Sequence, residues 1–70
     1  MNLITLTMIR GIGIDEDERE IENTVPVTII PSYIRSFNAR RNDRIGTRIT
    51  FANGSGFAVT ELPEEVAALI

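Results

Sequence analysis

Cysteine and histidine are both absent from this chain of 70 residues, and this absence limits how the fold can be stabilised. A domain of this size has a small core that rarely supplies more than about 3–5 kcal/mol of net stability. Such domains are usually reinforced by a disulfide, a structural metal or a second subunit. The sequence provides no disulfide and none of the commonest zinc ligands. We therefore expect a single domain, residues 1–70, that forms a homo-oligomer.

The overall charge of the chain limits the partners it can bind. Its net charge is −3 and its pI is about 4.7, so we do not expect a nucleic acid to bind over its whole surface. No apolar run approaches the ~20 residues that span a membrane. The first residues alternate with threonine as a strand does and lack a basic signal-peptide region. We expect the protein in the cytoplasm of a bacterium or of a phage-infected host cell, without a membrane partner.

Apolar residues recur at every second position along much of the chain, which is typical of half-buried strands. In the first such segment Ile4, Leu6 and Met8 share one face. Proline cannot donate to a ladder, so Pro26 predicts that the second strand lies at a sheet edge. Phe37 breaks the alternation and suggests a bulge in the third strand. The predicted strands cover residues 3–9, 25–30, 33–39, 47–52 and 57–59.

The connections and the C-terminal segment complete the predicted fold. Glycines 11 and 13 are expected to end the first strand, and residues 14–24 are expected to form a mobile acidic loop. Asn53-Gly54 is a strong hairpin signal. Residues 63–70 predict a short helix whose apolar stripe must be covered. The fold class is therefore mostly β: a small five-stranded antiparallel meander sheet or open barrel with a short C-terminal helix. Residues of the stripe are Leu62, Val66, Leu69 and Ile70.

Several turn and core positions resemble a known family. The relevant stretches are residues 3–7, Ile34, residues 49–54, residues 59–61, residues 63–66 and residues 69–70. In this arrangement the chain resembles the small FlbD-like proteins of flagellar operons, and domains of this look are also common in phage genomes. The acidic segment and Leu62 depart from the family pattern. The resemblance implies a small β-rich regulator and no particular activity.

The sequence lacks the side chains that most enzyme mechanisms need. Without histidine, cysteine or lysine, no serine nucleophile can be paired with a base. The carboxylates gather in a solvated segment, which is a poor setting for general acid catalysis. Asp15, Asp17 and Glu20 superficially suggest calcium, but Arg19 stands at a ligand position and the bending glycine is absent. We expect no enzyme activity, no catalytic residue, no metal site and no cofactor.

Charged residues are unevenly distributed along the chain. Residues 15–22 hold six of the ten acids, and residues 35–48 hold five of the seven basic residues, all of them arginine. Guanidinium groups match carboxylates and phosphates with a planar pair of donors. Repeated around an oligomer, a cluster of them would form an anion site. A solvated hairpin tip, or pairing with the acidic loop, would explain the same residues without a ligand. The cluster consists of Arg40, Arg41, Arg44 and Arg48.

These observations favour a non-catalytic binding or regulatory module that acts as a homo-oligomer. If the module is an FlbD-like regulator or a phage accessory protein, we expect its partner to be another protein. The alternative is a phage-encoded anti-defence sponge or inhibitor that sequesters an anionic nucleotide signal at subunit interfaces. RNA binding is the third possibility, although only four aromatic residues are available as stacking platforms.

Overall fold

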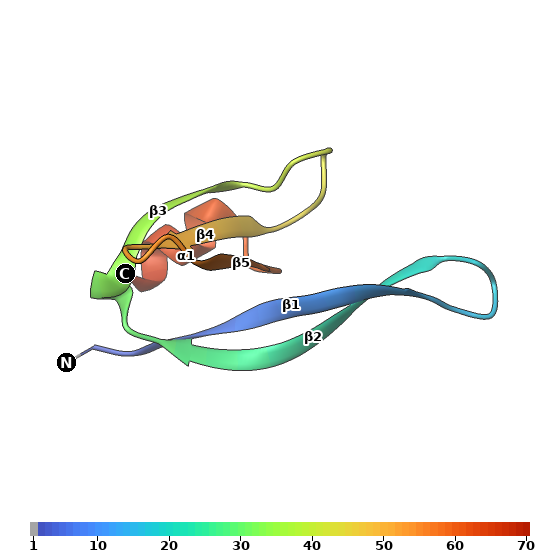
Figure 1. The fold of residues 1–70 in the computed structure, drawn as a ribbon, viewed down its shortest axis with the longest axis horizontal. Coiled ribbons are helices and arrows are strands. Elements are labelled where there is room, and N and C mark those ends of the chain that lie inside the picture. Colours follow the sequence, from blue (N-terminus) through green and yellow to red (C-terminus); the bar gives the residue numbers. More distant parts are fainter. Residues whose placement is uncertain (1) are drawn as a thin grey trace.

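The computed structural model describes residues 2–70; Met1, which the predicted domain includes, lies outside the described residues. The described part is mostly β, with five antiparallel strands in one open sheet and a short C-terminal helix, as predicted (Figure 1). The elements are β1 (Ile4–Ile14), β2 (Glu20–Ile29), a 3-10 turn η1 (Pro31–Tyr33), β3 (Ile34–Ala39), β4 (Thr47–Phe51), β5 (Gly56–Val59) and α1 (Pro63–Leu69).

The strands are arranged in the order β2-β1-β5-β4-β3. This is an up-and-down order in which the first and last strands also meet, where Met8 lies opposite Val59. The two edge strands, β2 and β3, do not pair with each other, so the sheet stays open between them. Pro26 therefore lies on an edge strand, as predicted, where its missing N–H costs no ladder hydrogen bond. The predicted bulge in β3 is confirmed by a register shift between Ile34 and Ser36.

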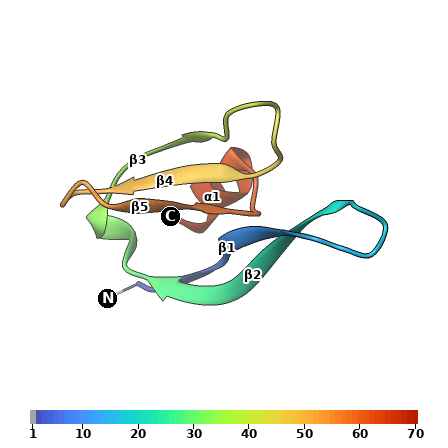
Figure 2. The ribbon, with the colours of Figure 1, turned by 45° about the vertical axis from the view of Figure 1, so that its right-hand side comes forward.

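The acidic segment is not a loop over its full length, which corrects the expectation for residues 14–24. β1 continues through Gly11 and Gly13, and the register runs on to Ile14 opposite Glu20. Only residues 15–19 form the connection. Both glycines have register partners on β2, Asn23 and Ile21, so they do not end β1. We call residues 10–23 the arm, because this end of the hairpin projects beyond the rest of the sheet (Figures 1 and 2).

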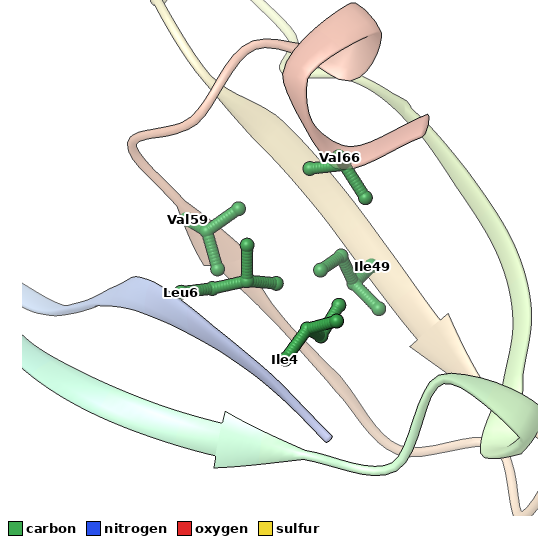
Figure 3. Packing of buried hydrophobic residues seen from close by; sticks show 5 residues of the cluster. All are labelled: Ile4, Leu6, Ile49, Val59 and Val66. Carbon is green, nitrogen blue, oxygen red and sulfur yellow. The ribbon is translucent and has the colours of Figure 1, made fainter. Parts of the chain in front are cut away.

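A small apolar core lies between the start of the β1–β2 hairpin and the layer made by β3, β4, β5 and α1. Ile49, Val59 and Val66 are fully buried, and Ile4 and Leu6 reach them from β1 (Figure 3). Ile4 and Leu6 lie on one face of β1, as their spacing of two residues predicted. Six partly buried residues pack around this cluster: Val27, Ile29, Ile34, Phe37, Phe51 and Phe57.

The junction between β1 and β5 is short and is reinforced by Glu61. The backbone N–H and the hydroxyl of Thr7 donate to the two carboxylate oxygens of Glu61, at 2.9 and 3.0 Å. Thr47, a buried polar residue, donates its hydroxyl to the Glu61 carbonyl oxygen at 2.7 Å. Polar contacts thus hold β1 against β5 where only one residue pair is in register.

Helix α1 covers one side of the core with part of its predicted stripe. Val66 is buried, but Leu69 and Ile70 remain 48% and 57% exposed. Leu62 has no side-chain acceptor for the helix N–H groups, whereas Glu65 accepts a hydrogen bond from the Leu62 N–H at 3.0 Å. Within residues 2–70 no helix is long and apolar enough to cross a membrane.

Candidate functional site

A polar groove of about 610 Å³ contains all four arginines that the sequence singled out. Its polar side chains are arginines, asparagines and a threonine, all of which can donate hydrogen bonds. None of the lining residues is acidic, and two alanines add small apolar walls. The lining consists of Asn38, Ala39, Arg40, Arg41, Asn42, Arg44, Arg48, Thr50 and Ala58.

The floor of the groove is the outer face of β3, β4 and β5. Arg48 stands between Asn38 on β3 and Ala58 on β5, and directly paired residues share one face of a sheet. Ile49, the next residue, is buried on the opposite face. Arg48 and Thr50 therefore point outward, in alternation with Ile49. The small side chain of Ala58 leaves room beside the Arg48 guanidinium.

The connection between β3 and β4 forms the other wall and carries Arg41 and Arg44. Asn42 and Asp43 adopt left-handed backbone conformations, with φ of 60° and 56°, which asparagine and aspartate tolerate better than most residues. The Arg44 N–H donates to the Arg41 carbonyl oxygen at 3.3 Å. The loop thus contains a hydrogen-bonded turn that carries both arginines.

Gly46 ends this loop, and two close neighbours leave no space for a side chain at this position. Its φ is +126°, which disfavours other residues. A Cβ there would collide with the carbonyl oxygen of Val59 and lie 3.0 Å from Cδ of Arg40. The absence of a side chain therefore lets the Arg40 stem pass beside the β5 backbone.

Arg40 is held within the protein by the arm. Its Nη1 atom lies 2.7 Å from Oε2 of Glu22, and the Arg40 side chain is only 10% exposed. The same Nη1 donates its hydrogen bond to the Ile45 carbonyl oxygen at 3.0 Å. Glu22 Oε2 is buried and accepts no hydrogen bond, so the guanidinium compensates its charge without an aligned donor. Arg40 therefore has mainly a structural role, because its guanidinium contacts the arm and the Ile45 carbonyl oxygen.

Arg44 makes a second, looser ion pair with the arm. Its Nη2 atom lies 3.3 Å from Oε2 of Glu20, and the two side chains are 36% and 62% exposed. Pairing of arginines with the acidic segment, one of the alternatives weighed from the sequence, thus accounts for Arg40 and Arg44. Within residues 2–70 no ion pair engages Arg41 or Arg48. The groove offers two arginines whose charge no carboxylate of the described chain compensates.

Sequence reasoning missed several residues of the groove. Asn38 and Asn42 line it, and Asn38 could have been found because it stands two residues before Arg40, the spacing of one strand face. The ion-pair partners of Arg40 and Arg44, Glu22 and Glu20, were not predicted, because the acidic segment is expected to be a loop from its sequence. Their spacing of two residues around Ile21 is the strand signal that could have revealed them.

A second, apolar pocket of about 590 Å³ lies where η1 meets the β4–β5 hairpin. Tyr33, Phe51 and Phe57 supply aromatic walls, and the rings of Phe51 and Phe57 lie 5.3 Å apart. Asn53 and Ser55 of the predicted hairpin turn provide polar atoms at its rim. No charged residue lines this pocket, so it differs in chemistry from the arginine groove.

The fold and groove define a class: a small open-sheet β protein with a basic, donor-rich groove. No family model, curated protein or solved structure was found to match the chain. The FlbD-like resemblance therefore stays a prediction. Among residues 2–70 no group of three or more acidic side chains gathers as a metal site would require.

Proposed function

We propose that the protein is a non-catalytic binding module that acts as a homo-oligomer and binds anionic groups in the arginine groove. The carrying observation is the composition of the groove, in which every polar side chain can donate and none is acidic. Arg41 and Arg48 lack intramolecular partners among residues 2–70, so an entering anion need not displace a carboxylate from them. Hydrogen bonds between arginine and an anion are about twice as strong as neutral ones.

The favoured ligand chemistry is a compact group with several acceptor oxygens, such as a phosphate or a cluster of carboxylates. The groove contains no aromatic residue on which a base could stack. A nucleotide would thus be held by its phosphates. The second candidate function is therefore a phage protein that sequesters an anionic nucleotide. A regulator with a protein partner would use the same arginines against acidic side chains.

Calorimetric titration with inorganic pyrophosphate tests the proposal. Arg48→Ala and Arg41→Ala should each weaken binding about tenfold or more, because each removes charged hydrogen bonds. Arg35→Ala is the matched control, since Arg35 is exposed and does not line the groove. Equal losses in all three variants, or none, would contradict the assignment of the groove.

Three further measurements characterise the ligand. Arg48→Lys should also weaken binding, because an ammonium cannot reproduce the planar pair of donors. A single RNA strand should bind with a strong salt dependence and with losses spread over all four arginines, whereas a compact anion should give losses concentrated at Arg41 and Arg48. Native mass spectrometry of protein purified from cells reports the subunit number together with any retained ligand.

A further inference from the structure

The tip of the arm is an ordered turn that displays acidic side chains. Asp15 accepts hydrogen bonds from the N–H groups of Asp17 and Arg19, at 2.9 and 2.8 Å, through one carboxylate oxygen. The Asp15 N–H donates to the Arg19 carbonyl oxygen at 3.0 Å. Asp15 therefore builds the turn, while Glu16 and Asp17 are exposed and form no ion pair within the described chain.

The arm also exposes apolar surface that its own chain does not cover. Ile14, next to the acidic turn, is 73% exposed, and Ile12 is 48% exposed. The register places both on the face of the arm that carries Glu20 and Glu22. A two-stranded hairpin is marginally stable in water on its own. Something beyond this chain is therefore expected to cover the arm.

The groove presents the complementary combination. Arg41 and Arg48 lack intramolecular carboxylate partners among residues 2–70, and Ile45 in the same β3–β4 connection is 74% exposed. The arm thus combines exposed acids with the exposed Ile14. The groove supplies arginines, and the exposed Ile45 lies outside its lining in the β3–β4 connection. The chain carries both halves of a matching contact.

We infer that the anionic group bound in the arginine groove is the arm tip of a second copy of this chain. Glu16 and Asp17 of one copy would meet Arg41 and Arg48 of the other, and Ile14 would pack near Ile45. This inference rests on the proposed anion-binding role of the groove and names its partner. Electrostatic complementarity of this kind sets orientation and excludes wrong partners.

A second copy is favoured over the chain's own arm by the intramolecular ion pairs. Glu22 and Glu20 already engage Arg40 and Arg44, at 2.7 and 3.3 Å, which anchors the arm beside the β3–β4 connection. The tip lies beyond these anchors and projects away from the sheet (Figure 2). When two copies exchange tips, the contact is made twice, because each copy supplies one tip and one groove.

Charge reversal on each side of the contact tests the inference in the full chain. A tip variant carries Glu16→Arg and Asp17→Arg and leaves the turn-building Asp15 intact. A groove variant carries Arg41→Glu and Arg48→Glu. The control variant carries Arg35→Glu, Ala67→Glu and Ala68→Glu, three exposed positions outside the arm and the groove, and has the same net charge as the groove variant. Sedimentation velocity at low salt gives the size of each species, and circular dichroism checks that each variant is folded.

The expected pattern has five parts. The parent and control chains associate, the tip and groove variants each sediment as a 7.8 kDa species, and their equimolar mixture associates again. A chain that carries both reversals should associate with itself. Added salt should weaken each associated species, because the contact includes exposed ion pairs. A parent chain that stays at 7.8 kDa at all concentrations, or variants that associate like the parent, would overturn the inference.

A mixture of folded variants that stays monomeric would also overturn it. If a reversed variant does not fold, Glu16→Gln with Asp17→Asn and Arg41→Gln with Arg48→Gln provide neutral substitutes, and each should weaken association at least tenfold.

Pyrophosphate titration of the same variants separates this inference from the proposed function. The tip variant should bind pyrophosphate at least as tightly as the parent, because no arm competes for the groove, whereas the groove variant should lose binding. Pyrophosphate should also dissociate the parent oligomer. Intact pyrophosphate binding with no rescue in the mixture would remove the second copy as the partner and leave the groove as an anion site. Loss of both would remove the two proposals together.

Discussion

The packed part of the molecule and the arm are stabilised by different interactions. In the packed part, Ile49 and Val59 of neighbouring strands and Val66 of α1 are fully buried together. The arm contacts the β3–β4 connection through two ion pairs, and its isoleucines remain exposed. Full burial of an aliphatic side chain contributes about 1.5–3 kcal/mol. An exposed ion pair such as Arg44–Glu20 contributes about 0–1 kcal/mol, and the Arg40–Glu22 pair is the more buried of the two. We therefore expect the packed part to determine folding, and we propose that the arm serves recognition.

Truncation of one isoleucine in each region should show the difference most clearly. Ile49→Ala should lower the free energy of unfolding by about 2–5 kcal/mol, because it leaves a cavity at a fully buried site. Ile14→Ala should change it by less than about 0.5 kcal/mol, because Ile14 is 73% exposed. Urea denaturation of both variants provides the measurement. Similar losses would mean that the arm is part of the core.

Alanine substitutions at Gly46 and Gly54 should distinguish the cost of a left-handed backbone from the cost of steric crowding. Both have positive φ, +126° and +91°, but a Cβ has open space only at Gly54. Gly54→Ala should cost about 1–2 kcal/mol for the left-handed backbone alone. Gly46→Ala should cost at least about 1 kcal/mol more, because it meets the Val59 carbonyl and the Arg40 stem. Equal melting temperatures for the two variants would refute the crowding.

The two ion pairs of the arm should differ in strength. Arg40→Ala should cost about 1–2 kcal/mol, because Arg40 is 10% exposed and its loss leaves the buried Oε2 of Glu22 uncompensated. Arg44→Ala should cost less than about 0.5 kcal/mol, because its pair with Glu20 is exposed to solvent. Chemical denaturation of both variants checks the order, and the reverse order would contradict the assigned roles.

Shortening the arm should have the smallest effect on folding. Ile12 and Glu22 lie directly opposite one another, so an Asn-Gly turn can replace residues 13–21 and keep the pair between Glu22 and Arg40. The free energy of unfolding should change by less than about 1 kcal/mol, because loop length affects closure entropy only slowly. The shortened chain should nevertheless lose self-association in sedimentation. A shortened chain that fails to fold would show that the arm supports the core.

Local sequence patterns predicted most of the packed part. Alternation located the strand face around Leu6, and Pro26 indicated the edge strand, because these signals depend only on neighbouring residues. Asn53-Gly54 indicated the hairpin between β4 and β5 for the same reason.

Features set by distant partners could not be predicted in this way. The pairing of β1 with β5 and the extension of β1 beyond Gly11 depend on register between segments far apart in the chain. Arg40 had been grouped with three other arginines, but its pair with Glu22 distinguishes it. The sequence located the charges of the groove and left open which of them the fold itself uses.

Amide hydrogen exchange at two protein concentrations tests the central claim most directly. In dilute solution the amides of β4 and β5 should be protected, while those of residues 10–23 should exchange much faster, because only the packed part has a core. At high concentration the arm amides should gain protection as tips enter the grooves of other copies, and the β4 and β5 amides should change little. Arm amides that are protected as strongly as β4 at every concentration would contradict the account, because the arm would then need no second copy.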